Sequence, residues 1–155
     1  MSEPLLEYLD ASNASATPLF ILLVEDEPAH AEIARRNLFD SSPAHRLIHV
    51  GDGLAALDYL HRKNDFADLQ SDPLPDLILL DLKMPKVGGL EVLRQIRENQ
   101  ELRKIPSVVL TTSADPADME AALRLGAAGF QIKPMSSESF TELLDNFPCN
   151  LPCFA

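Results

Sequence analysis

The sequence contains no tryptophan and only two cysteines, Cys149 and Cys153, both within its last seven residues. Two cysteines so placed do not form a disulfide framework. A Cys-x-x-x-Cys pair without nearby histidines is also a weak zinc motif. We therefore interpret them as reduced thiols in a C-terminal tail, and an intermolecular disulfide in oxidised preparations stays open.

Positive charge and long apolar runs are also scarce. Thirteen Lys and Arg stand against 24 Asp and Glu, which gives a net charge of −11. This balance argues against a nucleic-acid partner, because phosphate neutralisation requires Lys and Arg, and it disfavours an anionic membrane surface. The longest apolar run, residues 19–24, is far shorter than the ~20 residues of a membrane span. The first ten residues carry acids where a signal peptide carries positive charge, so we expect a cytoplasmic protein.

Short apolar runs that end in polar residues are what the sequence does contain. Residues 77–80 are all apolar and lead directly into Asp81, a pattern typical of a strand buried on both faces of a parallel sheet. We predict strands at 19–24, 46–50, 77–81, 105–110 and 129–132. They alternate with helices that begin near residues 28, 54, 90, 116 and 136. This alternation predicts an α/β fold with one doubly wound, five-stranded parallel sheet and five helices.

Composition divides the chain into three parts. We expect a flexible N-terminal segment at 1–17, one domain at 18–147 and a C-terminal tail at 148–155. In the first helix we expect Ile33, Leu38 and Phe39 on the inward face. Residues 63–75 are polar and rich in Asp and Pro, so we predict an exposed loop there.

Polar side chains stand at the ends of four predicted strands. They are Glu25 and Asp26, then Asp81, Thr111 and Lys133. Each has an ordinary interpretation alone, such as an acid near a helix N-terminus or a lysine in a turn. Because parallel strands end at one edge of a sheet, however, all of them should meet there, where ligands of such sheets bind. Three carboxylates so close favour a hard divalent cation with oxygen ligands, and Mg²⁺ is the natural choice.

Four segments carry a resemblance to a known family. They are VEDE at 24–27, LLDLKMPKVGG at 79–89, LTTS at 110–113 and GAAGFQIKP at 126–134. With these motifs the chain resembles the receiver domain of two-component response regulators, which has the flavodoxin-like fold of the chemotaxis regulator. The LTTS segment, the loop at 63–75 and the short tail resemble the stand-alone regulators of bacterial phytochromes.

This resemblance implies a role for each acidic residue. Asp81 would be the phosphoacceptor, a carboxylate nucleophile that forms an acyl phosphate. Asp26 and Asp81 would bind Mg²⁺ directly, Glu25 would bind it through a water molecule, and the main-chain carbonyl of Lys83 would complete the protein ligands.

The resemblance also implies a switch. Lys133 would neutralise the phosphoryl oxygens, Thr111 would hydrogen-bond the phosphoryl group once it arrives, and the ring of Phe130 would follow Thr111. Two departures from the family pattern are Glu25, where Asp is more usual, and Phe130, where Tyr is common. The peptide bond before Pro134 is expected to be cis.

The function implied is that of a single-domain response regulator in a two-component phosphorelay. A sensor histidine kinase, with a bacteriophytochrome as the candidate, would phosphorylate it, and a downstream protein or phosphotransfer domain would read it. It would catalyse only its own phosphotransfer and dephosphorylation. One alternative is a degenerate receiver that acts as a scaffold. Another is a haloacid-dehalogenase-type phosphatase, which needs an Asp where Lys83 stands.

The apolar tail predicts a homodimer. With Phe147, Leu151 and Phe154 exposed, a lone tail would be an aggregation hazard, so we expect it to cross with the last helix to a second protomer. A disordered tail is the alternative.

Overall fold

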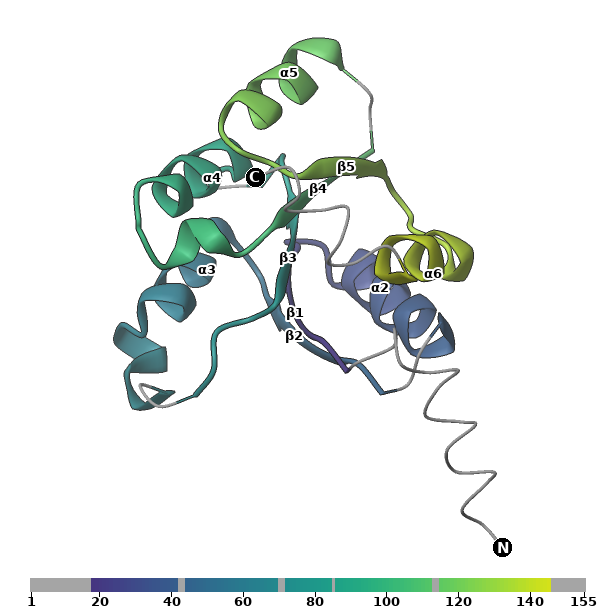
Figure 1. Ribbon diagram of the computed structural model, residues 1–155, viewed down its shortest axis with the longest axis horizontal. Coiled ribbons are helices and arrows are strands. Elements are labelled where there is room, and N and C mark those ends of the chain that lie inside the picture. Colours follow the sequence, from purple (N-terminus) through teal and green to yellow (C-terminus); the bar gives the residue numbers. More distant parts are fainter. Residues whose placement is uncertain (1–17, 42–43, 70–71, 85, 113–114, 146–155) are drawn as a thin grey trace, which may run out of the picture.

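The computed structural model describes residues 18–41, 44–69, 72–84, 86–112 and 115–145. Within these residues the chain forms one parallel sheet in the strand order β2-β1-β3-β4-β5, shown in Figure 1. The strands are β1 (Phe20–Val24), β2 (Arg46–Val50), β3 (Leu77–Asp81), β4 (Ser107–Thr111) and β5 (Gly129–Ile132). The predicted number, direction and approximate bounds of the strands are confirmed.

Helices cover both faces of the sheet. Helices α2 (Pro28–Ser41) and α6 (Ser137–Asp145) lie side by side on one face. Helices α3 (Gly53–His61), α4 (Gly89–Arg97) and α5 (Pro116–Arg124) follow one another along the other face. Two short 3₁₀ helices, η1 (Asn64–Leu69) and η2 (Leu102–Lys104), complete the described elements. The predicted doubly wound architecture is confirmed.

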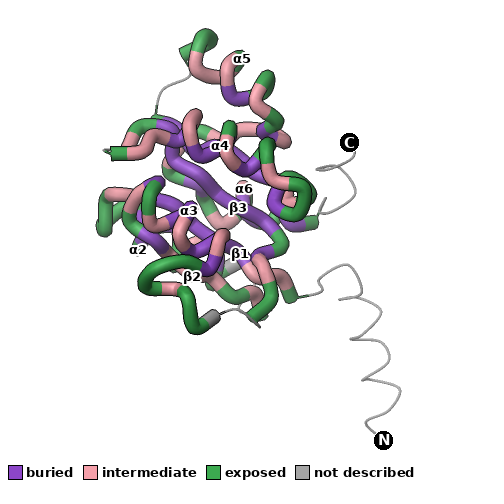
Figure 2. The backbone as a smooth tube through the Cα atoms, turned by 90° about the vertical axis from the view of Figure 1, so that its left-hand side faces the viewer, coloured by how far each residue is buried: buried purple, intermediate pink, exposed green. Residues whose placement is uncertain are grey.

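The central strand β3 is buried along its whole length, as Figure 2 shows. Ile78 and Leu80 pack with the helices α3 and α4, whereas Leu77 and Leu79 pack with α2 and α6. This explains the unbroken apolar run in the sequence, since both faces of the strand are covered. Full burial of such side chains contributes about 1.5–3 kcal/mol each, so the backbone that carries Asp81 is firmly held.

Hydrogen bonds confirm two predicted helix starts, and a backbone angle marks the end of α5. Asp115 precedes α5 and its carboxylate accepts a hydrogen bond from the Ala117 N–H at 3.0 Å. The hydroxyl of Ser136 accepts one from the Ser139 N–H at 3.0 Å before α6 begins. Gly126, just after α5, has a φ of 99°, a value that glycine adopts without strain.

The predicted inward face of α2 is wrong for two of its three residues. Leu38 is buried, but Ile33 is 41% exposed and Phe39 is 62% exposed. The face that meets the sheet is formed instead by Ala31, Ala34 and Leu38, spaced at helical intervals. Small alanines let the helix lie close to the sheet, and the larger apolar residues fall outside that stripe.

The predicted exposure of residues 63–75 is confirmed for most of the residues described there, but the segment is not a plain loop. Part of it forms η1, whose Phe66 ring packs edge-on against Tyr59 with ring centres 5.2 Å apart. The guanidinium of Arg62 is buried beside it and donates to the carbonyls of Asp72 and Pro73 at 3.0 and 2.9 Å. This segment is therefore anchored to α3.

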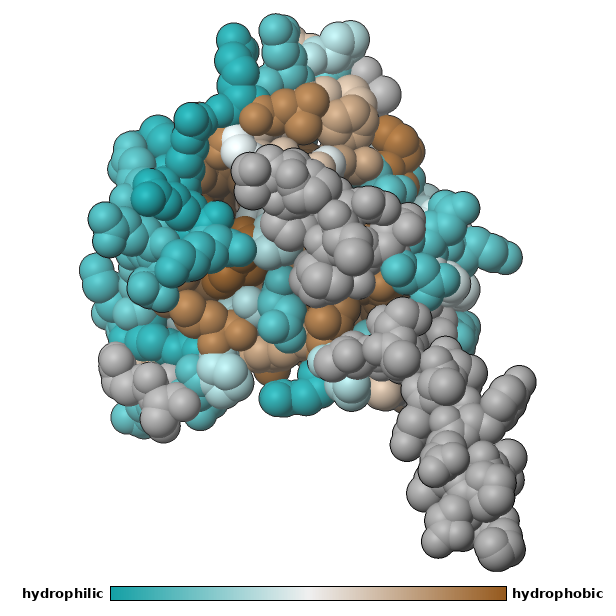
Figure 3. All heavy atoms as spheres, in the orientation of Figure 1, coloured by the Kyte–Doolittle hydropathy of each residue, from teal (hydrophilic) through white to brown (hydrophobic). Residues whose placement is uncertain are grey.

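Helix α5 is the most lightly attached helix of its face, because it buries only Ala122 among its residues. Leu123 on this helix and Ile132 on β5 are about half exposed. Figure 3 shows hydrophobic surface over this part of the molecule, whereas the side that carries α3 and α4 is mostly hydrophilic. In the described part of the chain, no helix has the length and apolarity needed to span a membrane.

Candidate functional site

The polar residues predicted at the strand ends do meet at one edge of the sheet. Asp81 is the last residue of β3 and Thr111 is the last residue of β4, while Glu25 and Asp26 follow β1 directly. Lys133 follows β5 directly, and its N–H donates to the Thr111 carbonyl at 2.7 Å. The parallel register of the strands is what brings them together.

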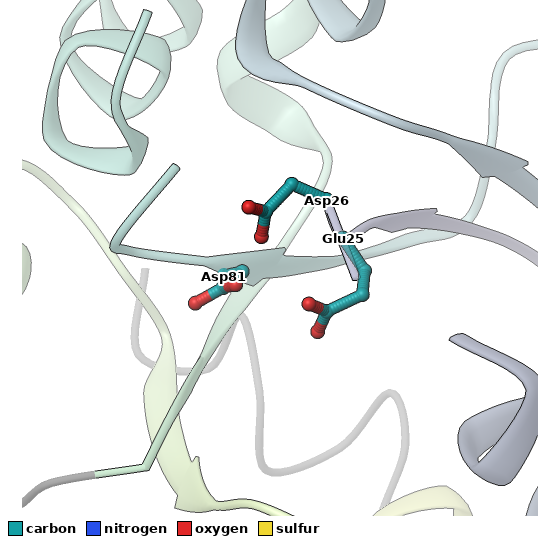
Figure 4. Close-up of side chains that lie close together, drawn as sticks. All are labelled: Glu25, Asp26 and Asp81. Carbon is teal, nitrogen blue, oxygen red and sulfur yellow. The ribbon is translucent and has the colours of Figure 1, made fainter. Parts of the chain in front are cut away.

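Three carboxylates form a compact cluster at this edge. Glu25, Asp26 and Asp81 each offer an oxygen, and these oxygens all lie within 4.8 Å of one another. Figure 4 shows the three side chains converging from the ends of β1 and β3. Glu25 is 1% exposed and Asp81 is 5% exposed. Such a set of oxygen donors can hold a divalent cation.

The Lys133 ammonium lies against this cluster. It donates to Glu25 Oε1 at 2.7 Å and to Asp81 Oδ2 at 3.3 Å. The peptide bond between Lys133 and Pro134 is cis, as expected. The second oxygen of Glu25 accepts a hydrogen bond from the Glu27 N–H at 3.1 Å, so both oxygens of this carboxylate have partners.

Burial and crowding perturb the charges at the site. Burial, followed by the negative charge of Glu25, raises the pKa of Asp81 to about 6, although Lys133 opposes this rise. For Lys133, burial alone would lower the pKa, but the hydrogen bond to Glu25 and the charges of Asp81 and Glu25 raise it above its usual value. The acids therefore repel one another, and the lysine compensates only part of that repulsion.

The loop after Asp81 is tied both to Asp81 and to the neighbouring helices. The Lys83 N–H donates to Asp81 Oδ1 at 3.3 Å, and the Lys83 ammonium pairs with Asp118 of α5 at 3.3 Å. The Gly89 N–H closes the loop by donating to the Leu82 carbonyl at 3.0 Å. A Cβ at position 89 would lie only 2.5 Å from the Asp81 carbonyl oxygen, so the close approach requires glycine.

Thr111 and Phe130 lie on neighbouring strands and on the same face of the sheet. Phe130 pairs with Val109, and both pack into the core under α3 and α4. Thr111 comes two residues after Val109, so its side chain points to that face as well. Thr111 lies at the site edge, whereas Phe130 lies deeper along β5, outside the charged cluster.

Two histidines at the site were not predicted from the sequence. His30, in the first turn of α2, places its Nδ1 atom 3.2 Å from the Lys133 ammonium. His49 of β2 places its Nε2 atom 2.7 Å from the main-chain oxygen of Glu25. The expected position of the first helix N-terminus at this edge could have indicated His30. No motif marks His49, whose role depends on strand register.

Comparison with known proteins identifies the same architecture. A family model for the response regulator receiver domain matches residues 21–145. The chain is 43% identical over 114 residues to "Response regulator Rcp1" of Synechocystis sp. (strain ATCC 27184 / PCC 6803 / Kazusa), an alignment that covers 74% of this chain and 76% of that protein.

Two solved structures are similar in fold and size. The phosphorylated cyanobacterial phytochrome response regulator RcpA superposes with a TM-score of 0.72 at 31% identity, over 90% of this chain and 97% of that one. The Mn²⁺-bound form of response regulator Rcp1 gives a TM-score of 0.70 at 36% identity, over 85% of this chain and 93% of that one.

Proposed function

Because this chain belongs to the response regulator receiver domain family, we propose that it accepts a phosphoryl group from a sensor histidine kinase on Asp81 and signals by contacts with other proteins. One observation carries the proposal. Asp81 is a buried carboxylate at the sheet edge, with two further acids on one side and the Lys133 ammonium 3.3 Å away. This arrangement offers a nucleophile together with groups that can neutralise a phosphoryl group.

The proposed reaction is an in-line transfer. A carboxylate oxygen of Asp81 forms a bond to phosphorus while the bond from phosphorus to the kinase histidine nitrogen breaks, and its electron pair leaves with the imidazole. The product is an acyl phosphate. Lys133 would neutralise a phosphoryl oxygen, and the Thr111 hydroxyl would hydrogen-bond the group after transfer. Phe130, on the same face as Thr111, would then move with it.

The acidic cluster fits a divalent cation, and we propose Mg²⁺. Asp26 and Asp81 would bind it directly, and the main-chain carbonyl of Lys83 would be a third protein ligand. The bound ion would supply positive charge beside the phosphoryl oxygens. Both oxygens of Glu25 already have partners, the Lys133 ammonium and the Glu27 N–H, which supports contact through a water molecule.

Two alternatives have less support. A haloacid-dehalogenase-type phosphatase needs a carboxylic acid two residues after the nucleophile. Lys83 stands there, and its ammonium pairs with Asp118. A receiver that serves only as a scaffold would not need the buried acids and the lysine to lie together. A scaffold function therefore does not explain the crowded charges of this site.

The partners are proposed from the relatives. Receiver domains accept phosphoryl groups from histidine kinases, and a phytochrome response regulator is among the similar structures. A bacteriophytochrome is therefore the proposed kinase, with exchange in the cytoplasm. Homodimerisation through the tail involves residues outside the described ranges, so it stays a prediction. The last helix is no longer expected to cross with the tail, because α6 packs against α2 of its own chain and buries Phe140 there. Light scattering should give the mass of a dimer for the full chain and the mass of a monomer for a truncation after residue 146. A monomer mass for both proteins would refute the prediction.

A direct test is reaction with acetyl phosphate. We expect wild-type protein with Mg²⁺ to gain the mass of one phosphoryl group in a base-labile form, and to gain far less in EDTA. Asp81→Asn should gain none, whereas Asp68→Asn, which removes an exposed acid on η1, should react like wild type. Full labelling of Asp81→Asn would exclude Asp81 as the acceptor.

A further inference from the structure

The ammonium of Lys133 has three acceptors within hydrogen-bond distance. They are Glu25 Oε1 at 2.7 Å, His30 Nδ1 at 3.2 Å and Asp81 Oδ2 at 3.3 Å. A lysine ammonium has three N–H donors and no acceptor. All of its donors are therefore engaged before any phosphoryl group arrives, and the side chain is only 9% exposed.

His30 is the weakest of these three partners. Because an ammonium can only donate, Nδ1 of His30 is the acceptor in this contact. All three hydrogen bonds have an ionised donor, but the two carboxylates also carry the opposite charge, and the imidazole lacks that added attraction. The His30 side chain is also 43% exposed, so water can replace it.

The position of His30 is fixed by the fold. It lies in the first turn of α2, the helix that packs against α6 on the same face of the sheet. Its ring borders a cavity of about 220 Å³ whose lining includes Ile33, Met135 and the Lys133 side chain. His30 is therefore much more exposed to solvent than the Lys133 side chain that it contacts.

We propose that His30 is a positioning residue that holds Lys133 in the unphosphorylated protein and competes with the phosphoryl group for its third donor. This inference rests on the proposed phosphorylation of Asp81. Capture of a phosphoryl oxygen by Lys133 requires one existing hydrogen bond to open, and the bond to the half-exposed imidazole, which lacks a negative charge, opens first. His30 thus lowers the affinity of the empty site for phosphoryl groups and keeps the ammonium in place for the acids.

The test compares two variants that differ in one acceptor. His30→Ala removes the acceptor, whereas His30→Asn keeps an oxygen one bond beyond Cγ, where Nδ1 stands in histidine. The probe is beryllium fluoride with Mg²⁺, a mimic of a phosphoryl group on a carboxylate, titrated by calorimetry. We expect His30→Ala to bind it about 3- to 10-fold more tightly than wild type, the range expected for one net hydrogen bond. His30→Asn should stay within about 2-fold of wild type.

Titration with Mg²⁺ alone separates positioning from folding. Both variants should bind Mg²⁺ within about 2-fold of wild type, because His30 donates no ligand. Equal or weaker beryllium fluoride binding by His30→Ala would overturn the inference, as would His30→Asn behaving like His30→Ala. A parallel fall in Mg²⁺ affinity would assign His30 a purely structural role and overturn it too. If wild type itself bound no beryllium fluoride, the proposed function would fail first, and the inference with it.

Discussion

Removal of the Asp81 charge should stabilise the metal-free protein. Burial and the neighbouring Glu25 raise the pKa of Asp81 from 3.8 to about 6, so folding disfavours its ionised form. One pKa unit corresponds to about 1.4 kcal/mol, which sets an upper limit of about 3 kcal/mol. We expect Asp81→Asn to gain about 1–3 kcal/mol in EDTA at pH 7.5, a rise in melting temperature of roughly 3–10 °C for a domain of this size.

The effect should depend on pH in a defined direction. Well below pH 3.8 the carboxyl is protonated in both the folded and the unfolded chain, so the repulsion is absent and the two proteins should melt alike. Between pH 4 and pH 6 the wild-type protein progressively loses stability relative to the variant. Above pH 6 the difference should be constant.

Thermal denaturation followed by circular dichroism measures this difference. Asp68→Asn, at an exposed position on η1, controls for the change in net charge and should shift the melting temperature by less than about 2 °C. With saturating Mg²⁺ the order should reverse, because a ligand that binds only the folded state stabilises it and the variant lacks one ligand. A lower melting temperature of Asp81→Asn in EDTA at pH 7.5, or a gain of undiminished size at pH 4, would refute the reasoning.

Two further predictions concern the loop after the phosphoacceptor. Gly89→Ala should destabilise the protein by about 1–3 kcal/mol and slow phosphorylation, because its Cβ would lie 2.5 Å from the Asp81 carbonyl oxygen. Gly88→Ala is the matched control, because its Cβ would lie 3.7 Å from the nearest carbonyl oxygen, that of Leu82. Equal melting temperatures for the two variants would contradict this view. Asp118→Asn should leave stability within about 1 kcal/mol of wild type, since the Lys83 side chain of this ion pair is largely exposed and Asp118 is only partly buried. It should lengthen the acyl phosphate lifetime about 2- to 5-fold, because the released ammonium can pair with the phosphoryl group. Mass spectrometry over time measures that lifetime. If Asp118→Asn lengthened the lifetime equally in a protein that also carries Lys83→Gln, the lysine would be excluded as the cause.

The strand ends were predictable because one rule governs all of them. A parallel strand appears in the sequence as a mainly apolar segment, and the polar residue at its carboxyl end marks the sheet edge. Asp81, Thr111 and Lys133 could therefore be placed together although 52 residues separate the first from the last. That inference requires only the direction of the strands and no side-chain geometry.

Contacts that depend on helix phase or side-chain reach could not be predicted in the same way. The inward stripe of α2 consists largely of alanines, whose weak hydrophobicity is hidden by Ile33 and Phe39 beside it. The contact between His30 and Lys133 joins residues 103 positions apart and depends on the rotation of α2 about its axis. A histidine in a helix carries no motif that could indicate such a contact.

The light attachment of α5 has a consequence for the motions of the molecule. Its single buried side chain, Ala122, contributes little free energy to docking, whereas β3 is covered on both faces. Amide hydrogens of α5 should therefore exchange with solvent through small local openings, and those of β3 only through global unfolding. The strand that carries Asp81 would then stay rigid, while α5, which follows the neighbouring strand β4, would undock at a small cost in free energy. A change in charge at the site that alters the interaction free energy of α5 by a few kcal/mol would therefore suffice to change its docked population.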